Sequence, residues 1–202
     1  MAITIYRSTD TSAPILTGQA GKMAGLLDAC LVDGYPNAVK ASLGWSRAYT
    51  GTNLRSYRMA AGSQSYLAID DVGTTTCRVR GFRTMTAAGP AVANGSNPWP
   101  SEAQVAGGCY WIKSTTADAV ARPWVLISNG TIIYIWVDNG STGIGSIHAF
   151  GDMSSYNLTD TNPCILISMI SDLKSRFPQV SSINTTCTVY SHLLATKYDG
   201  LT

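Results

Sequence analysis

Histidine and charged residues are scarce in this chain. Two of its 202 residues are histidines, His148 and His192, and charged residues make up 13%, about half the usual share of a soluble protein. A hydrolase that activates serine or cysteine needs a base beside its nucleophile, most often histidine. No G-x-S-x-G segment supports a nucleophile elbow. The weakly charged, hydroxyl-rich composition instead favours a surface that packs against neighbours.

Long apolar runs and basic stripes are also missing. The longest apolar runs, 132–137 and 164–170, are far shorter than the roughly 20 residues that span a bilayer. Arg7 and Asp10 interrupt the segment where a secretion signal would be apolar, so we expect no signal peptide. Lysine and arginine are scattered and the net charge is +2. We therefore expect neither a membrane nor a nucleic acid as a direct partner.

The cysteines lie far apart, with no CxxC pair and no histidine at metal-ligand spacing. A zinc site is therefore not expected, and we predict no metal and no cofactor. Two interpretations remain open. The thiols are reduced core residues, since free cysteine is among the most buried residue types, or their odd number leaves one to bridge two subunits. The candidates for such a bridge are Cys30, Cys77, Cys109, Cys164 and Cys187.

The N-terminal segment predicts a strand followed by a helix. Ile3 and Ile5 alternate with Thr4 and Tyr6, which is the period of a half-buried strand or of an arm that completes a neighbour's sheet. From 19 to 33, apolar residues recur at the spacing of one helix face, and Gly34 is a plausible left-handed cap. The apolar positions are Ala20, Met23, Ala24, Leu27, Cys30 and Leu31.

The clearest hairpin lies in the second half of the chain. Two apolar segments, 123–128 and 131–137, flank Asn129-Gly130, a pair that accepts the positive φ angles of a type I′ turn. The second segment is apolar on both faces, as is typical of a central strand. By contrast, the segment 87–108 shows no period, and we expect a long loop exposed to neighbours.

Together these patterns predict a single α+β domain, mainly antiparallel β, with one N-terminal amphipathic helix packed on the sheet. Its expected parts are an N-terminal strand or arm (1–18), the helix (19–33) and a β-rich body (35–202). Turn signals such as Asn129-Gly130 and Asn139-Gly140 divide that body into short segments.

Residues that could carry catalysis are isolated. His148 could form a triad with Asp152 or Asp138 and a cysteine, but a buried or loop histidine requires nothing more. The adjacent carboxylates Asp70 and Asp71 could serve a glycosidase, yet neighbouring strand residues point to opposite faces, and turn chemistry explains them more simply. We therefore expect that the protein is not an enzyme.

The aromatic residues suggest two kinds of binding surface. Trp45 and Trp99 fall in predicted loops, where their rings could stack against sugars. Aromatic residues are also enriched in subunit interfaces. We take Ile3, Ile5, Trp99 and Tyr110 as candidate subunit contacts.

A succession of short segments resembles the small virion structural proteins of tailed bacteriophages. The strand, the turn, the helix and the residues that end it in 3–35 are similar to the N-terminal part of these proteins. Further similar motifs follow in the same order along about three quarters of the chain. They are Gly44-Trp45, Gly51-Thr52-Asn53, Tyr57-Arg58, Arg80-Gly81-Phe82, Trp111-Ile112-Lys113-Ser114, Ala121-Arg122-Pro123-Trp124 and Phe150-Gly151-Asp152.

The resemblance implies a multicopy, non-enzymatic component of the virion, in its head, neck, collar or tail. Its partners would be further copies of itself and other virion proteins, and it would be made in the cytoplasm of a host bacterium. The family offers no catalytic residues to transfer, and the several cysteines depart from its pattern. The alternative is a receptor-binding or carbohydrate-binding module on the virion, of the tail fibre or spike type, with Trp45 and Trp99 as stacking platforms.

Overall fold

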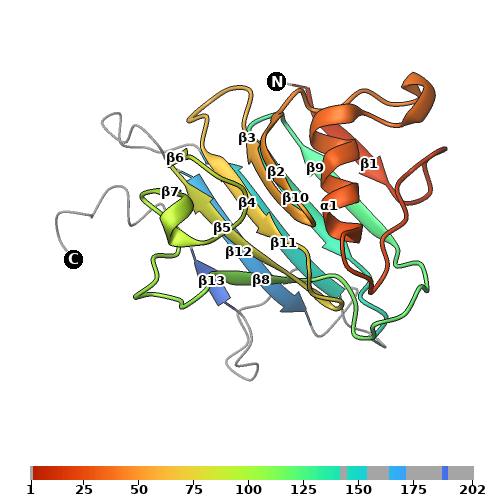
Figure 1. Ribbon diagram of the computed structural model, residues 1–202. Helices are drawn as coiled ribbons and strands as arrows, with labels where there is room; N and C mark the ends of the chain where they lie inside the picture. Colours follow the sequence, from red (N-terminus) through yellow and green to blue (C-terminus); the bar gives the residue numbers. More distant parts are fainter. Residues whose placement is uncertain (1, 142–144, 154–163, 172–187, 191–202) are drawn as a thin grey trace.

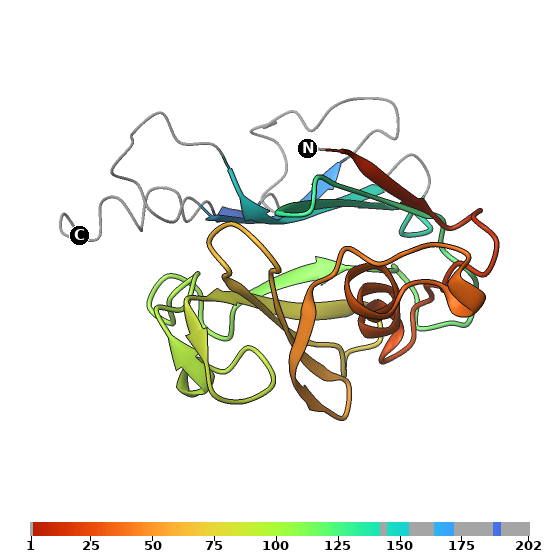
Figure 2. The same cartoon turned by 90° about the horizontal axis from the view of Figure 1, so that it is seen from above.

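Two antiparallel sheets lie face to face in the computed structural model, which describes residues 2–141, 145–153, 164–171 and 188–190 (Figures 1 and 2). Sheet A has the strand order β1 (Thr4–Arg7), β9 (Trp124–Ser128), β10 (Ile132–Val137), β11 (Gly145–Asp152), β12 (Cys164–Ser171) and β13 (Thr188–Tyr190). Sheet B has the order β2 (Ser46–Gly51), β3 (Leu54–Arg58), β4 (Tyr66–Asp70), β5 (Thr76–Phe82) and β8 (Cys109–Ile112). The prediction of a mainly antiparallel α+β fold is confirmed.

The helix lies in the same layer as sheet B and covers one part of sheet A (Figure 2). It consists of α1 (Lys22–Leu27), continued by the π-helical turn η1 (Asp28–Asp33). It begins later than the predicted residue 19, because Gly21 has a φ of 77°, which a helix cannot contain. The helix ends at Gly34, which has a φ of 78° and a ψ of 175°. The positive φ fits the prediction, but the ψ is extended, so Gly34 does not form the predicted left-handed cap. The helix follows β1 and is not strictly N-terminal.

Asp28 ties the helix to sheet B. Its carboxylate accepts hydrogen bonds from Nε of Arg47 on β2 (2.8 Å) and from Nε of Arg55 on β3 (3.0 Å). The hydroxyl of Tyr57, also on β3, donates to the same carboxylate (2.8 Å). Charge-assisted bonds of this kind are the stronger protein hydrogen bonds, and here they fix the helix beside the first two strands of its own layer.

The predicted hairpin is present, with a different turn. Strands β9 and β10 pair as neighbours in the middle of sheet A, with Ser128 opposite Ile133. This register leaves four residues, 129–132, between the paired positions. Gly130 has a positive φ of 98° and Asn129 does not, so the type I′ prediction is wrong. The carboxamide oxygen of Asn129 instead accepts the N–H groups of Thr131 (3.0 Å) and Ile132 (3.1 Å) and closes a wider turn.

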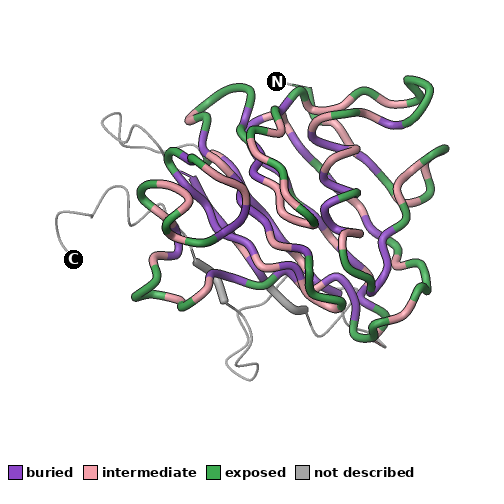
Figure 3. Tube along the Cα trace, in the orientation of Figure 1, coloured by how far each residue is buried: buried purple, intermediate pink, exposed green. Residues whose placement is uncertain are grey.

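The main core lies between sheet A and the layer of sheet B and the helix. Buried positions recur along the strands of both sheets and along the helix (Figure 3). Every second residue of a strand contributes to the main core, as the pleat requires. From sheet A these include Leu126, Ile133, Ile135, Phe150 and Leu166, all buried. A second cluster of Ala68, Phe82 and Met85 lies on the far side of sheet B.

The segment 87–108 is largely a loop, as its composition predicts, with two short elements in it. It contains the short helix η3 (Val92–Asn94) and the strand β7 (Gly95–Ser96), which pairs with β6 (Thr84–Met85). Ser56 on β3 donates its hydroxyl to the carbonyl of Ala87 and accepts the N–H of Gly89 (both 3.3 Å). The segment therefore packs on sheet B of its own chain, where its polar backbone groups find partners.

Candidate interaction surface

The outer face of sheet A, which points away from sheet B, is mainly apolar. Ile5, Ile127, Tyr134, Ala149 and Ile167 are successive cross-strand neighbours from β1 to β12. Their alternate neighbours along the strands belong to the core, so this row points outward. Such directly opposed side chains contact one another across a sheet.

Two further rows extend this face. On one side Val125, Trp136 and Ile147 are opposed in register, and on the other Ile132 and Ile165 flank Gly151. A Cβ atom at Gly145 would lie 2.7 Å from Nε1 of Trp136, so only glycine leaves room for the indole there. The outer face of sheet A is thus continuous across the described strands.

Exposure is concentrated at one end of this face. Ile127 is 40% exposed and Tyr134 is 42% exposed, whereas Ala149 and Ile165 are buried. Arg7 is the one charged residue on this face among the described residues of β1, β9, β10, β11 and β12. Contiguous exposed apolar patches on a protein surface mark sites of interaction.

The four predicted subunit contacts do not lie together. Ile3, which is 70% exposed, and Ile5 lie at the β1 edge of the outer face of sheet A. Tyr110 is exposed on β8 opposite Arg78, on the far face of sheet B. Trp99 is buried, so the prediction that it offers an exposed contact is wrong for the single chain.

Trp45 and Trp99 are core residues and present no free ring face. Trp99 lies over Gly81, where a Cβ atom would come within 2.1 Å of its ring, and its ring stacks on Phe150 with 6.2 Å between centroids. Trp45 meets the same Phe150 edge-on and donates its Nε1–H to the carbonyl of Gly130 (2.8 Å). The prediction that they form sugar-stacking platforms is therefore wrong, because the inter-sheet core already occupies both rings.

His148 closes the edge of sheet B. Strand β8 has a partner on one side only. On the other side, Nε2 of His148 donates to the carbonyl of Ile112 (3.0 Å), and the hydroxyl of Ser168 donates to the carbonyl of Tyr110. His148 and Ser168 are register partners on β11 and β12. Two adjacent residues of sheet A therefore donate hydrogen bonds to the carbonyls of Ile112 and Tyr110, which face away from sheet B at its edge.

This role explains the electrostatics of His148. Its ring is fully buried and stacks on Trp111 with 5.3 Å between centroids. Burial lowers the pKa of His148 to about 4, although the hydrogen bond to Ile112 acts in the opposite direction. Asp152, its proposed triad partner, instead accepts the N–H and the hydroxyl of Ser63 (both 2.6 Å). The geometry therefore assigns His148 to packing.

The described cysteines are free and buried. Burial raises the pKa of Cys30 and of Cys109 to about 12, and it also raises the pKa of Cys77 and of Cys164. Their burial fits the interpretation as reduced core thiols at these four positions. A bridge between subunits through at least one of the cysteines stays a prediction, and at these four positions it would require the buried sulfur atom to become accessible. Cys187 lies outside the described residues.

The paired carboxylates separate, as the alternation of a strand predicts. Asp70 pairs with Arg78 (2.8 Å). Asp71 is fully buried and forms an ion pair with the equally buried Lys113, and its other oxygen accepts the N–H of Ala24 in α1 (2.9 Å). Burial raises the pKa of Asp71, while the bond from Lys113 acts in the opposite direction. Sequence reasoning missed Lys113, because nothing in its local pattern marks a buried lysine.

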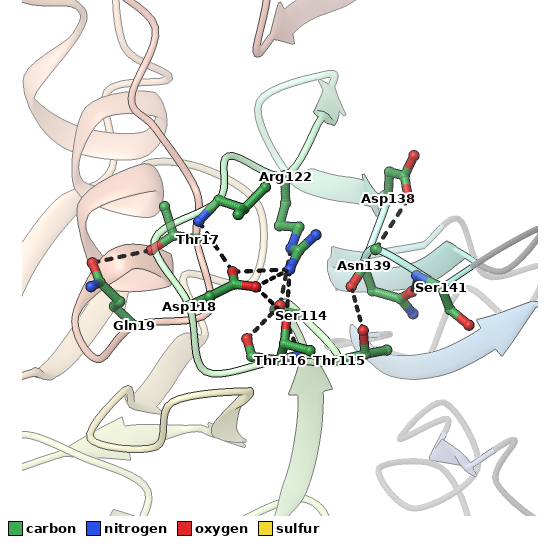
Figure 4. A network of polar contacts seen from close by, with 12 residues as sticks. Thr17, Gln19, Ser114, Thr115, Thr116, Asp118, Arg122, Asp138, Asn139 and Ser141 are labelled. Carbon is green, nitrogen blue, oxygen red and sulfur yellow. Dashed lines mark hydrogen bonds and ion pairs between the residues drawn. The ribbon is translucent and has the colours of Figure 1, made fainter.

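A polar cluster joins the segment after β8 to the turn after β10 (Figure 4). Arg122 donates from Nε to the hydroxyl of Ser114 (3.0 Å) and from Nη2 to Asp118 (3.0 Å). The N–H of Thr115 donates to the carbonyl of Asn139 (2.8 Å). These partners satisfy one another within the chain, so the cluster fixes the crossing from sheet B to sheet A.

Within the residues that the structure describes, no group of three or more His, Cys, Asp or Glu side chains could hold a metal ion. None of the described helices has the length and apolar character needed to cross a membrane. Compared with protein-family models, curated proteins and solved structures, the chain matches none of them.

Proposed function

We propose that this chain is a non-enzymatic structural component of a tailed-phage virion, at the head-neck-tail region, and that it assembles in multiple copies with itself and with other virion proteins. The observation that carries the assembly is the outer face of sheet A, which is apolar over neighbouring strands and has Arg7 as its one described charge. The order of motifs that resembles virion proteins supplies the setting.

Physical reasons favour this face as the contact. Ile127 and Tyr134 expose about two fifths of their surface, and burying the remainder contributes on the order of 1 kcal/mol for each side chain. Tyrosine and tryptophan are enriched where subunits meet, and a face with few charges has little to desolvate. Arranged in a ring or an array, each copy of such a protein covers the surface of the next.

The test is a double variant, Ile127→Lys with Tyr134→Lys, which places two charges at the exposed end of the face. We expect wild-type protein to form an oligomer by sedimentation velocity and to occur in many copies in purified particles. The double variant is expected to sediment as a monomer and to be absent from particles. A charge in a desolvated interface costs several kcal/mol when it has no partner.

Val120→Lys is the matched control, because Val120 is 58% exposed and lies in the segment between β8 and β9, outside the strands that form this face. It should assemble as the wild type does. Tyr110→Lys asks whether the far face of sheet B contributes. A wild-type protein that stays monomeric at high concentration and does not enter particles would contradict the proposal.

A further inference from the structure

Arg80 on β5 is a buried cation whose hydrogen bonds are incomplete. It lies on the far face of sheet B, opposite Ala68 in register, and its side chain has no exposed surface. Nη2 donates to Oε2 of Glu102 (2.8 Å) and to the carbonyl of Val105 (3.0 Å). Nε and Nη1 are buried with no hydrogen-bond partner. Leaving donors of a buried charged group unpaired is costly and calls for an explanation.

Glu102 covers this guanidinium from the solvent side. Its side chain is 54% exposed. One carboxylate oxygen accepts from Arg80 and the other accepts the N–H of Gly107 (3.0 Å). These bonds, that from Arg80 above all, lower the pKa of Glu102. A carboxylate held between a guanidinium and a backbone N–H is bound as a small anion is bound.

Two glycines bring the backbone close to the guanidinium of Arg80. Gly107 and Gly108 have φ values of 81° and 95°, a conformation that favours glycine. A Cβ atom on Gly108 would lie 2.6 Å from the carbonyl oxygen of Val79 and 3.4 Å from Nε of Arg80, so only glycine fits there. A Cβ atom on Gly107 would lie 3.6 Å from Nη1 of Arg78. Two guanidinium groups therefore flank a stretch of backbone without side chains.

We propose that Arg80, together with the N–H of Gly107 and the neighbouring Arg78, forms a binding site for a small oxyanion, in which Glu102 is an internal occupant. The external anion takes the place of the Glu102 carboxylate when that exposed side chain turns away. The anion then accepts hydrogen bonds from Nη2 of Arg80 and from the N–H of Gly107. Its negative charge also lies close to the unpaired Nε and Nη1 donors.

The experiment opens the site with Glu102→Ala in the full chain, since an exposed side chain can be truncated without leaving a core cavity. Thermal unfolding is measured with increasing sodium phosphate, and separately with sodium acetate, at constant ionic strength set with sodium chloride. We expect the melting temperature of the variant to rise by roughly 3 °C at ten times the dissociation constant. Wild-type protein should require a higher phosphate concentration, because Glu102 competes.

Two double variants identify the residue responsible. Glu102→Ala with Arg80→Gln should lose the response, whereas Glu102→Ala with Arg83→Gln, which removes an exposed arginine just beyond β5, should keep it. The single variant decides the matter even where Arg80→Gln does not fold. A response of Glu102→Ala no larger than that to chloride alone, or one that survives Arg80→Gln, would overturn the site. Acetate matching phosphate would indicate a carboxylate ligand, and a response to phosphate alone a tetrahedral one.

Discussion

Among individual residues, His148 shows how burial decides a role that composition leaves open. One of two histidines in the chain, it is the natural candidate for a catalytic base. The structure instead stacks it on Trp111 and directs Nε2 at the carbonyl of Ile112. Because a carbonyl only accepts, Nε2 carries a proton. Burial lowers the pKa of the ring to about 4, so the ring is neutral at pH 7.

The neutral state of His148 makes stability depend on pH. The pKa of His148 is about 4 in the folded protein and 6.5 unfolded, so the unfolded state binds the proton more readily. Its contribution to stability is complete above pH 6.5 and is lost as pH falls from about 6.5 to about 4. Relative to His148→Gln, which donates without titrating, wild-type protein should lose about 3 kcal/mol between pH 7 and pH 4.

Urea unfolding of both proteins at pH 7, 5.5 and 4 measures this difference. The comparison with His148→Gln cancels the carboxylates that titrate in both proteins. If the difference between the unfolding free energies of wild-type protein and His148→Gln is constant over this pH range, His148 is not buried in its neutral form.

At the scale of elements, the ion pair of Asp71 and Lys113 joins three segments. Asp71 follows β4, Lys113 follows β8, and Asp71 binds α1 at its first turn, where the N–H groups of a helix have no internal partner. The ammonium of Lys113 also donates to the carbonyl of Gln19 (2.8 Å). Gly21, at the N-cap position, has no side chain to cap the helix. Asp71, 47 positions from Ala24 along the chain, accepts the N–H of Ala24 instead.

Removing one partner of this pair should cost more than removing both. Asp71→Leu and Lys113→Met each leave an uncompensated group in the interior, and we expect losses of about 3–5 kcal/mol. The double variant replaces the pair with apolar side chains, so its loss should be much smaller than the sum. A double-mutant cycle from urea unfolding measures the coupling, and strictly additive losses would show that the pair is not coupled.

The elements also show how far patterns reach. The alternation of Ile3 to Tyr6 and the apolar segments around Asn129-Gly130 correctly predict β1, β9 and β10. The four-residue turn was not predictable, because the carboxamide of Asn129 competes with the expected type I′ geometry by binding two nearby N–H groups. The sequence did not show that the loop 87–108 is anchored on sheet B, because its anchor, Trp99 over Gly81, joins residues of two different segments.

For the molecule as a whole, the stacking of the two layers determines which chemistry is accessible. The four described cysteines are distributed over the helix and both sheets, and all are buried. A thiol reacts through its thiolate, and burial both hides the sulfur atom and raises its pKa. Thiol–disulfide exchange at these cysteines therefore requires local opening of the structure.

In a Cys187→Ser background, we expect no reaction of the four thiols with a disulfide reagent at pH 8 on the timescale of minutes. In concentrated guanidinium chloride all four should react, which is the control for their chemical competence. Intact particles carrying this variant should give only monomer bands on a non-reducing gel. A fast-reacting thiol in the native protein, or a ladder of cross-linked bands, would contradict the burial described above.

The sequence by itself determined the class of fold, because the hydrophobic period and the turn residues act locally. Both patterns can be recognised within a few neighbouring residues. Low charge and the apolar faces of 3–5 and 131–137 also led to the prediction of a surface that packs against neighbours. Only the tertiary structure decided which residues lie on that surface: it placed Trp45 and Trp99 in the core and left Ile127 and Tyr134 exposed. Burial depends on what packs against a side chain, and those partners come from segments far away along the chain.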